Sequence, residues 1–303
     1  MRTALVTGAS RGFGQRTAVT LARRGWFVFA TMRDTSSSEP LERAAASAGV
    51  AGSVSVVRLD VLDGESIDAA KETVLGATGG VLDALICNAG VATGGVFEHY
   101  PAEEFRRVFD TNFYGTVDTT RAFLPAVRRS RGGLVVLSSD YGLFSAPALS
   151  AYNASKFALE GWTEALWYEL RPFGVNVVLL EPGAYKTGIW DGGVYGAEAD
   201  GAYGDFMGRV EAAGRKWADR AGDCQPVADT IATALDRRRP KLRYPVGADA
   251  WALAAAKGIL PDRLRAIVVR QQTGLTRWRP PARALSLERA SDATPVEEGA
   301  GMP

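Results

Sequence analysis

Tyr152 and Lys156 have the residue types and the spacing needed to transfer a proton. Residues four apart on a helix share one face, about one turn apart. A phenol is a poor acid at neutral pH because its pKa is near ~10, and an ammonium held beside it favours the phenolate and lowers that pKa. The pair therefore predicts an acid–base centre, although the same spacing also occurs where an aromatic stem packs under a solvated lysine.

A glycine-containing turn at residues 7–14, with the sequence TGASRGFG, follows an apolar run and opens an amphipathic stretch. Glycines let a backbone approach a pyrophosphate closely, and the first turn of a helix offers free N–H groups and a positive dipole end. Because the turn lies between a strand and a helix, it has the context that a dinucleotide loop requires. A plain tight turn is the alternative. The residues predicted to bind phosphate are Gly8, Ser10, Arg11, Gly12, Phe13 and Gly14.

The end of the second apolar run indicates which nucleotide is bound. Arg33 is the first charged residue there, and Arg11 adds a second cation. A forked guanidinium suits a 2′-phosphate, so NADP(H) is favoured over NAD(H). Alternatively, Arg33 is solvated and Asp34 accepts from the ribose hydroxyl. Asp60, after the third apolar run, could accept from the adenine amino group or lie at a helix N-terminus ahead of Gly64.

Short apolar runs alternate with helix-length segments, which is typical of a parallel sheet covered on both faces. With the glycine loop, this pattern predicts an α/β fold of the Rossmann type, with a doubly wound parallel sheet of about seven strands. Strands are expected at 4–6, 26–30, 54–59, 82–87, 134–137, 175–180 and 242–244. Helices are expected at 15–24, 40–48, 64–76, 101–129 with a break, 151–171, 226–237 and, as one or two helices, 248–272.

The residue composition and the alternation of strands and helices change after Pro182. We expect residues 1–245 to form the catalytic domain, 246–279 a helical extension and 280–303 a polar, disordered tail. Residues 186–224 are rich in Gly, Tyr, Trp and Asp and show no strand pattern. They are interpreted as a substrate lid, with a surface insertion as the alternative.

Composition excludes several classes of protein. The 303 residues carry a formal net charge of +1, so no charge-driven nucleic-acid or anionic-membrane partner is indicated. Cys87 and Cys224 are too few for a disulfide framework, and a single histidine, His99, argues against a metal site. No apolar run is long enough to span a bilayer, and no leader pattern opens the chain. We therefore expect a cytoplasmic protein without stable membrane insertion.

Several local patterns occur together in one order, with Ser139 thirteen residues before Tyr152. They are the 7–14 loop, Asn88-Ala89-Gly90, Asn112, Ser139, Tyr152 with Lys156, Pro182-Gly183 and Thr187. In this combination the chain resembles the short-chain dehydrogenase/reductase family, in its single-domain branch. The resemblance implies an NADP(H)-dependent ketoreductase or alcohol dehydrogenase acting on CH–OH groups.

The resemblance also implies catalytic roles. Tyr152 would be the general acid in carbonyl reduction and the base in the reverse direction, and Lys156 would hold the nicotinamide ribose and lower the pKa of Tyr152. Ser139 would donate to the carbonyl oxygen; Ser138 could also serve, but the spacing selects Ser139. Asn112 would carry a water in a proton relay, or be a polar residue at a helix kink, or both.

The rest of the implied site contacts the cofactor and the substrate. Beyond the glycine loop and Arg33, the implied cofactor residues are Asp60, Val61, Asn88, Ala89, Gly90, Tyr152, Lys156, Pro182, Gly183 and Thr187. Segments 29–34, 246–250 and 259–264 are similar to the steroid- and retinol-dehydrogenase-like subgroup, which implies a hydrophobic ketone or secondary alcohol as substrate. Its predicted contacts are Ser139, Phe144, Tyr152, Tyr185 and Trp190, whose aromatic rings could equally be packing residues.

Three other functions stay open. The chain could be an NAD(H)-dependent dehydrogenase of the same family, or a cofactor-binding sensor or scaffold without chemistry. An epimerase or dehydratase acting on a nucleotide sugar is the third, although such relatives carry a larger C-terminal domain and a differently spaced glycine loop. The family resemblance also implies a homodimer or homotetramer.

Overall fold

The computed structural model describes residues 1–195, 201–257 and 259–281. The predicted tail at 280–303 therefore lies almost wholly outside the described residues, as does the part of the predicted lid at 196–200. All statements below concern the described residues.

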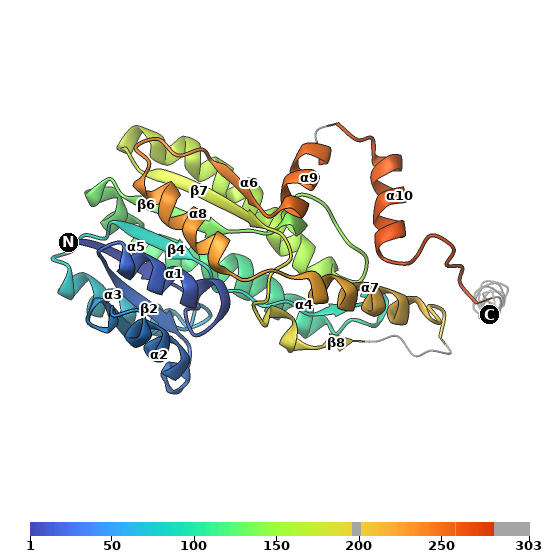
Figure 1. Cartoon of the computed structure of the whole chain (residues 1–303), viewed down its shortest axis with the longest axis horizontal. Coiled ribbons are helices and arrows are strands. Elements are labelled where there is room, and N and C mark those ends of the chain that lie inside the picture. Colours follow the sequence, from blue (N-terminus) through green and yellow to red (C-terminus); the bar gives the residue numbers. More distant parts are fainter. Residues whose placement is uncertain (196–200, 258, 282–303) are drawn as a thin grey trace, which may run out of the picture.

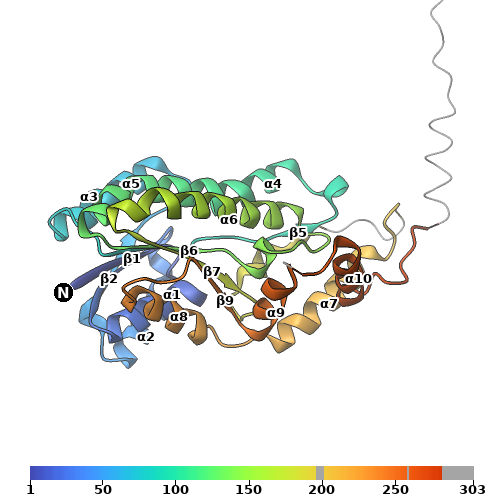
Figure 2. The same ribbon diagram turned by 90° about the horizontal axis from the view of Figure 1, so that it is seen from above.

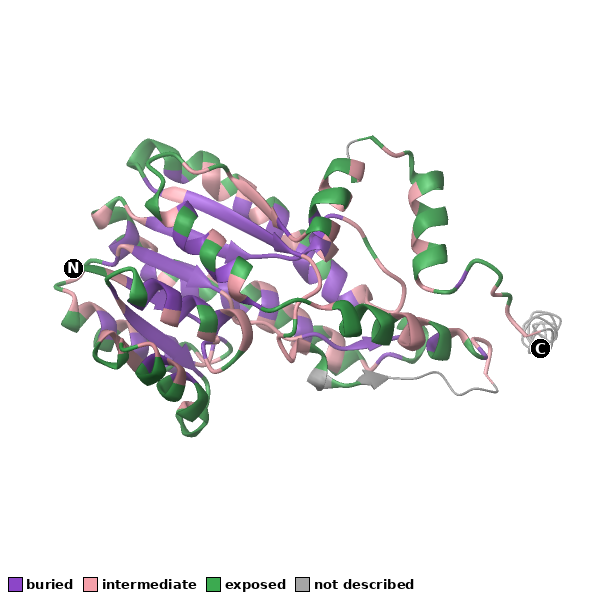
Figure 3. Cartoon of the chain, in the orientation of Figure 1, coloured by how far each residue is buried: buried purple, intermediate pink, exposed green. Residues whose placement is uncertain are grey.

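A seven-stranded parallel sheet forms the centre of the molecule, with the strand order β3-β2-β1-β4-β6-β7-β9 (Figure 1). This confirms the predicted Rossmann-type sheet of about seven strands. Its inner strands are apolar runs buried on both faces, whereas the edge strands β3 and β9 are only partly buried (Figure 3). Their bounds are β1 Arg2–Val6, β2 Trp26–Met32, β3 Val54–Arg58, β4 Ala84–Cys87, β6 Gly133–Leu137, β7 Asn176–Pro182 and β9 Arg243–Val246.

Helices cover both faces of the sheet (Figure 2). One layer holds α1 Gly12–Arg23, α2 Glu39–Ser47 and α8 Gln225–Asp236. The other holds α3 Gly64–Ala77, α4 Ala102–Phe109, α5 Gly115–Ser130 and α6 Ser150–Leu170. Two hydrophobic clusters of buried side chains lie between the sheet and these layers, one on each face. The sheet is thereby held rigidly, so that its carboxyl edge can position a site.

The predicted break in the helical segment 101–129 is confirmed. A five-residue π-helical turn, Asp110–Tyr114, separates α4 from α5. Such turns are frequent at functional sites because they redirect one side chain out of the helical register. Here the buried residue in the turn is Asn112.

The predicted lid contains more regular structure than its composition indicated. Strand β8, Val194–Tyr195, pairs in parallel with β5, Gly94–Gly95, and α7 spans Phe206–Arg220. The expectation of no strand in 186–224 is therefore wrong for β8, which is too short for an alternating pattern to reveal. A β-bridge between Tyr185 and Gly222 joins the two ends of the segment. The chain therefore enters and leaves the predicted lid side by side.

Two helices follow the last strand, α9 Ala248–Lys257 and α10 Asp262–Gln272. They lie beyond the carboxyl edge of the sheet, on the same side of the molecule as α7 (Figures 1 and 2). Of the helices that the structure describes, none is long and apolar enough to cross a membrane.

Candidate active site

The predicted site residues gather along the carboxyl edge of the sheet, on the segments that leave β1, β4, β6 and β7. This is the edge at which open α/β sheets bind ligands.

The glycine loop forms a cradle that side chains would fill. Gly8 and Gly12 have φ angles of +64° and +60°, which are left-handed conformations that favour glycine. A Cβ added to Gly14 would lie 2.3 Å from the carbonyl oxygen of Gly8 and 2.6 Å from Asn88 Nδ2. The loop therefore presents bare backbone at the start of α1, which fits the pyrophosphate of a dinucleotide.

Asn88 and Ala89 fix this cradle from the neighbouring strand. Asn88 Nδ2 donates to the carbonyls of Thr7 at 2.8 Å and Gly8 at 2.9 Å. The backbone N–H groups of Asn88 and Ala89 both donate to Thr7 Oγ1, each at 2.9 Å. The Asn-Ala-Gly segment thus holds the shape of the loop as well as bordering the cofactor cleft.

Thr187 and Tyr185 reach the glycine loop from the far side of the cleft. A Cβ on Gly12 would lie 3.1 Å from the carbonyl oxygen of Thr187. The Tyr185 ring meets that of Phe13 edge-on, with centroids 5.5 Å apart. Tyr185 therefore packs on the glycine loop through Phe13, and its assignment as a substrate contact stays a prediction.

At the nucleotide end, Arg11 and Arg33 are both exposed. Asp34 is engaged locally: its side chain accepts from the N–H of Ser36 at 2.9 Å and from the Ser36 hydroxyl at 2.7 Å. These bonds cap the short turn that follows β2 and lower the pKa of Asp34. One oxygen of the Asp34 carboxylate, Oδ1, is thus engaged by its own turn.

Asp60 does not cap the third helix. Asp63 is the N-cap of α3, where its carboxylate accepts from Ser66 N at 3.2 Å. Asp60 instead accepts from the N–H of Leu62 at 3.1 Å, immediately before α3. Asp60 thus lies in the turn just ahead of α3 without being its N-cap, and a contact of Asp60 and the adjacent buried Val61 with adenine stays a prediction.

Ser139 and Tyr152 meet at the end of β6. Ser139 Oγ donates to Asp140 Oδ1 at 2.8 Å and accepts from the N–H of Tyr141 at 3.2 Å. Tyr152, on the first turn of α6, is 5% exposed. Its phenol lies close enough to the Ser139 side chain for that serine to act on the pKa of Tyr152. The helix thus carries the phenol to the serine that the spacing of the sequence selected.

Burial controls the ionisation of this pair. It raises the pKa of Tyr152 well above its ordinary value; the Ser139 hydrogen bond opposes that rise and the charge of Asp140 adds to it. Burial also lowers the pKa of Lys156 to about 8, against the charge of Glu160. Lys156 Nζ donates to the carbonyl of Leu137 at 2.9 Å and lies 5.6 Å from the centroid of the Tyr152 ring. In this structure, therefore, the ammonium does not lower the pKa of Tyr152 as expected, because desolvation dominates.

Asn112 ties three elements together from its π-helical turn. Its Oδ1 accepts from Val91 N at 2.8 Å, and its Nδ2 donates to Val91 O and to Ser155 Oγ, each at 3.0 Å. Ser155 precedes Lys156 on α6, so Asn112 links the loop after β4 to the catalytic helix. The helix-kink interpretation is confirmed, and the water relay stays a prediction.

Two residues beside Ser139 belong to the site although the sequence assigned them no role. Asp140 is buried, and burial raises its pKa to about 7, opposed by the Ser139 hydrogen bond and reinforced by the charge of Asp249. The Tyr141 ring lies 6.0 Å from that of Tyr152 and 5.2 Å from that of Phe144. In the sequence, the only indication that Asp140 and Tyr141 belong to the site is that they directly follow Ser139. Asp249 itself accepts from the N–H of Ala184 at 2.9 Å, beside the Pro182-Gly183 turn.

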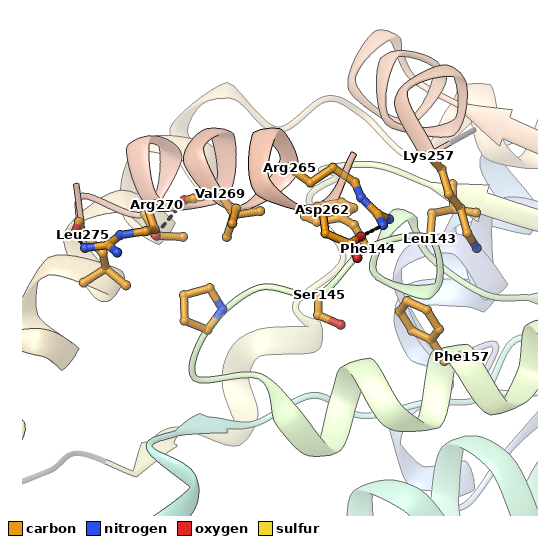
Figure 4. Close-up of a pocket in the computed structure, with 13 residues that line it drawn as sticks. Leu143, Phe144, Ser145, Phe157, Lys257, Asp262, Arg265, Val269, Arg270 and Leu275 are labelled. Atoms are coloured by element: carbon orange, nitrogen blue, oxygen red, sulfur yellow. Dashed lines mark hydrogen bonds and ion pairs between the residues drawn. The ribbon is translucent and has the colours of Figure 1, made fainter. Parts of the chain in front are cut away.

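Aromatic side chains lie around the phenol, and a cavity opens farther along the 143–147 loop. The Trp190 ring lies 5.5 Å from that of Tyr152. A cavity of about 480 Å³ opens beyond Phe144, between the 143–147 loop and α10. In Figure 4, Ser145 and Phe157 face it from one side and Val269 and Arg265 from the other. The structure thus brings Phe144 and Trp190 near Tyr152, on a largely apolar surface.

Comparison with known proteins agrees with this geometry. The model of the short chain dehydrogenase family matches residues 2–193. An uncharacterized oxidoreductase of Bacillus subtilis is 41% identical over 80% of this chain and 88% of its own length. Estradiol 17-beta-dehydrogenase 1 of Rattus norvegicus is 37% identical over 79% of this chain and 72% of its own.

Solved structures show the same fold. A short-chain dehydrogenase from Streptomyces avermitilis superposes with a TM-score of 0.75 at 34% identity, covering 90% of this chain and 97% of its own. A metagenomic short-chain oxidoreductase in complex with NADP gives 0.64 at 27% identity, over 81% and 96% of the two chains. One from Burkholderia phymatum in complex with NAD gives 0.69 at 28% identity, over 89% and 95%.

The chain therefore belongs to the short-chain dehydrogenase family and is similar to its steroid-dehydrogenase-like members. It is an NAD(P)-dependent oxidoreductase that acts on CH–OH groups.

Proposed function

We propose that this enzyme reduces a hydrophobic ketone with NADPH, and oxidises the corresponding secondary alcohol in reverse, with Tyr152 as the acid–base residue. The observation that carries the proposal is the convergence of Ser139, Tyr152 and Lys156 at the end of β6, beside the glycine cradle of β1.

The residues of the chain divide the work between binding and proton transfer. A bound nicotinamide dinucleotide supplies the hydride. Ser139 and Tyr152 donate to the carbonyl oxygen, which stabilises the charge that develops there. Because burial keeps the phenol of Tyr152 protonated at neutral pH, Tyr152 holds the proton that a reduction needs. Lys156 holds its charge beside the phenol, ready to bind the ribose hydroxyls.

Two features support NADP(H) over NAD(H). Arg33 is exposed at the end of β2, with Arg11 on the glycine loop, and a guanidinium suits a 2′-phosphate. Asp34, the competing reader of the ribose hydroxyl, caps its own turn through Ser36. In an NAD(H)-dependent enzyme the ribose hydroxyl would have to bond to the other oxygen of Asp34, because Oδ1 already accepts both bonds from Ser36.

The apolar surroundings of Tyr152 support a hydrophobic substrate. Phe144, Tyr141 and Trp190 supply aromatic surface, and the cavity beyond Phe144 is large enough for a medium-sized apolar ligand. The likeness to estradiol 17-beta-dehydrogenase 1 favours a bulky ketone of the same chemical class.

The homodimer or homotetramer expected from the family is part of the proposal. Phe157 and Tyr168 on α6 are exposed at 40% and 63%, so the catalytic helix keeps uncovered apolar surface. Sedimentation of the full chain would report a single 32.3 kDa species if the proposal is wrong.

The decisive experiment is turnover of steroid, retinoid and aliphatic ketones with NADPH and with NADH, by wild type and by Tyr152→Phe. We expect activity with NADPH on bulky ketones and a loss of at least about 100-fold in kcat for the variant, because its ring lacks the acid. NADPH affinity should stay within about threefold, since the variant keeps the ring.

Unchanged turnover in Tyr152→Phe would refute the assigned acid. Absence of turnover on every ketone, with cofactor binding intact, would favour the sensor or scaffold instead.

A further inference from the structure

Four ionisable side chains follow one face of α6 at intervals of four residues: Tyr152, Lys156, Glu160 and Glu164. The side chains of the first three lie against one segment, residues 137–142, which covers the end of β6 and includes Ser139. Tyr152 lies beside Ser139, and Lys156 Nζ donates to the carbonyl of Leu137.

Glu160 continues the line on that segment. A Cβ on Gly142 would lie 2.5 Å from Ser138 Oγ and 3.0 Å from Glu160 Oε1, so both polar atoms lie against the same glycine. Glu160 is 5% exposed. A carboxylate is thus buried one helical turn behind the ammonium of Lys156.

A second buried carboxyl group lies beside Glu160. Glu181 on β7 is 1% exposed, and Arg243 Nε lies 3.2 Å from Glu160 Oε2 and 3.4 Å from Glu181 Oε1. Arg243 Nη2 also contacts Glu164 Oε2 at 2.7 Å, at the rim of the cluster. One guanidinium therefore faces two buried carboxyl groups and one half-exposed one.

Two adjacent buried carboxyl groups with one shared cation do not both ionise readily. Burial and the charge of Glu160 raise the pKa of Glu181 to about 8, while Arg243 acts against that rise. Burial raises the pKa of Glu160 as well, opposed by Ser138, Arg243 and Lys257. Glu160 has the shorter contact with Arg243, so the shared proton resides on Glu181.

The remaining charged groups around Glu160 do not replace it as a partner of Lys156. Glu164 lies a further turn away, and Lys257 on α9 holds its ammonium 5.4 Å from the Phe157 ring. Asp140 bonds to Ser139 and Tyr141, on the side of the phenol. Glu160 is the carboxylate whose charge supports the ammonium of Lys156.

We propose that Glu160 is a positioning residue that keeps buried Lys156 protonated, and that Glu181 carries the proton that leaves Glu160 ionised. The inference rests on the proposed function, because a charged Lys156 matters for holding the ribose and for favouring the phenolate once Tyr152 has given up its proton. Arg243 closes the cluster toward solvent and holds the two carboxyl groups together.

The test titrates Lys156 directly, by NMR of the full chain labelled with 13C at lysine Cε and without cofactor. The chain has six lysines, so the signal of Lys156 is assigned with one Lys156→Arg variant. Glu160→Gln should lower the pKa of Lys156 by about one unit or more, since it removes the opposite charge one helical turn away in a buried site. The matched control, Glu164→Gln, removes a carboxylate that also contacts Arg243 but should leave the titration in place.

Two further variants keep the test decisive if Glu160→Gln fails to fold. Glu181→Gln is isosteric with the protonated acid and should hardly change the pKa of Lys156. Glu160→Asp keeps the negative charge but moves it away by one methylene group. It should lower the pKa of Lys156 by less than Glu160→Gln does. A shift in Glu181→Gln as large as expected for Glu160→Gln, or no shift in Glu160→Asp, would overturn the assignment.

The pH profile of turnover separates this inference from the proposed function. In Glu160→Gln the alkaline limb of kcat should move to lower pH by the same shift as the lysine titration, with KM for the ketone little changed. A lysine shift without any movement of the limb would mean that Lys156 is supported as proposed but does not control turnover. An unmoved titration in an active enzyme would overturn the inference and leave the proposed function standing.

Discussion

The phosphate end and the proton end of this site are built from different materials. At the phosphate end, the glycine loop offers backbone, held by uncharged hydrogen bonds that Asn88 and Ala89 donate to Thr7 and Gly8. At the proton end, side chains of Tyr152, Lys156 and Asp140 are buried with shifted pKa values. Backbone geometry tolerates no added atoms but is independent of pH, whereas buried ionisable groups tolerate isosteric change but respond to pH and to every neighbouring charge.

The largest effect of a single substitution is expected at the glycine loop, and it tests whether the phosphate end is as rigid as described. Gly14→Ala places a Cβ 2.3 Å from the carbonyl oxygen of Gly8, a backbone atom that cannot move without opening the cradle. We expect cofactor affinity to fall by at least about 100-fold, at all pH values, measured by fluorescence titration with NADPH.

The control is Gly76→Ala in α3, where an added Cβ meets no atom within 4 Å. It should bind cofactor like the wild type. Normal affinity in Gly14→Ala would mean that the loop adapts and is not a rigid cradle.

A smaller effect, dependent on pH, is expected at Asp140. Its pKa is about 7 in the folded chain and near its ordinary value of 3.8 when unfolded, so the native state binds this proton more tightly. The stabilisation that this provides is complete below about pH 4 and is lost as pH rises through 7. Asp140→Asn has no such titration and should gain on the order of 2 kcal/mol in free energy of unfolding relative to wild type between pH 5 and pH 8.

Urea unfolding of the wild type and of Asp140→Asn at pH 5 and at pH 8 measures this difference in free energy of unfolding. Glu181 titrates in both chains, so it cancels in the comparison. Parallel pH dependence in the two chains would show that Asp140 is solvated and ionised in the native state.

The smallest effect is expected at the nucleotide end, where charges are exposed. Arg33→Ala should weaken NADPH binding by about 10-fold while leaving NADH within about twofold, because the 2′-phosphate loses one charge-assisted partner. Asp34→Asn is the matched control, since an asparagine can still cap the turn at Ser36. Comparison of the two dissociation constants at fixed ionic strength would expose an NAD(H) enzyme, in which Asp34→Asn weakens NADH instead.

The sequence predicted the elements that are rich in local signal. Apolar runs marked each strand of the large sheet, and Gly8 to Gly14 marked the loop because the positive φ angles of Gly8 and Gly12 favour glycine. Strand β8 was missed because two residues carry no periodicity. The contact of Tyr185 with Phe13 was not predicted, because sequence order does not reveal which way a loop residue after Pro182 points.

The amino-acid sequence by itself determined the fold, the cradle and the candidate acid–base pair, since these depend on local conformation and on spacing along one helix. Only the tertiary structure decided how those groups ionise. It packs α6 against the end of β6, excludes water from Tyr152 and Lys156, and brings Glu181 of β7 and Arg243 of β9 to Glu160. Desolvation and charges from distant parts of the chain set a pKa, and both exist only once the chain has folded.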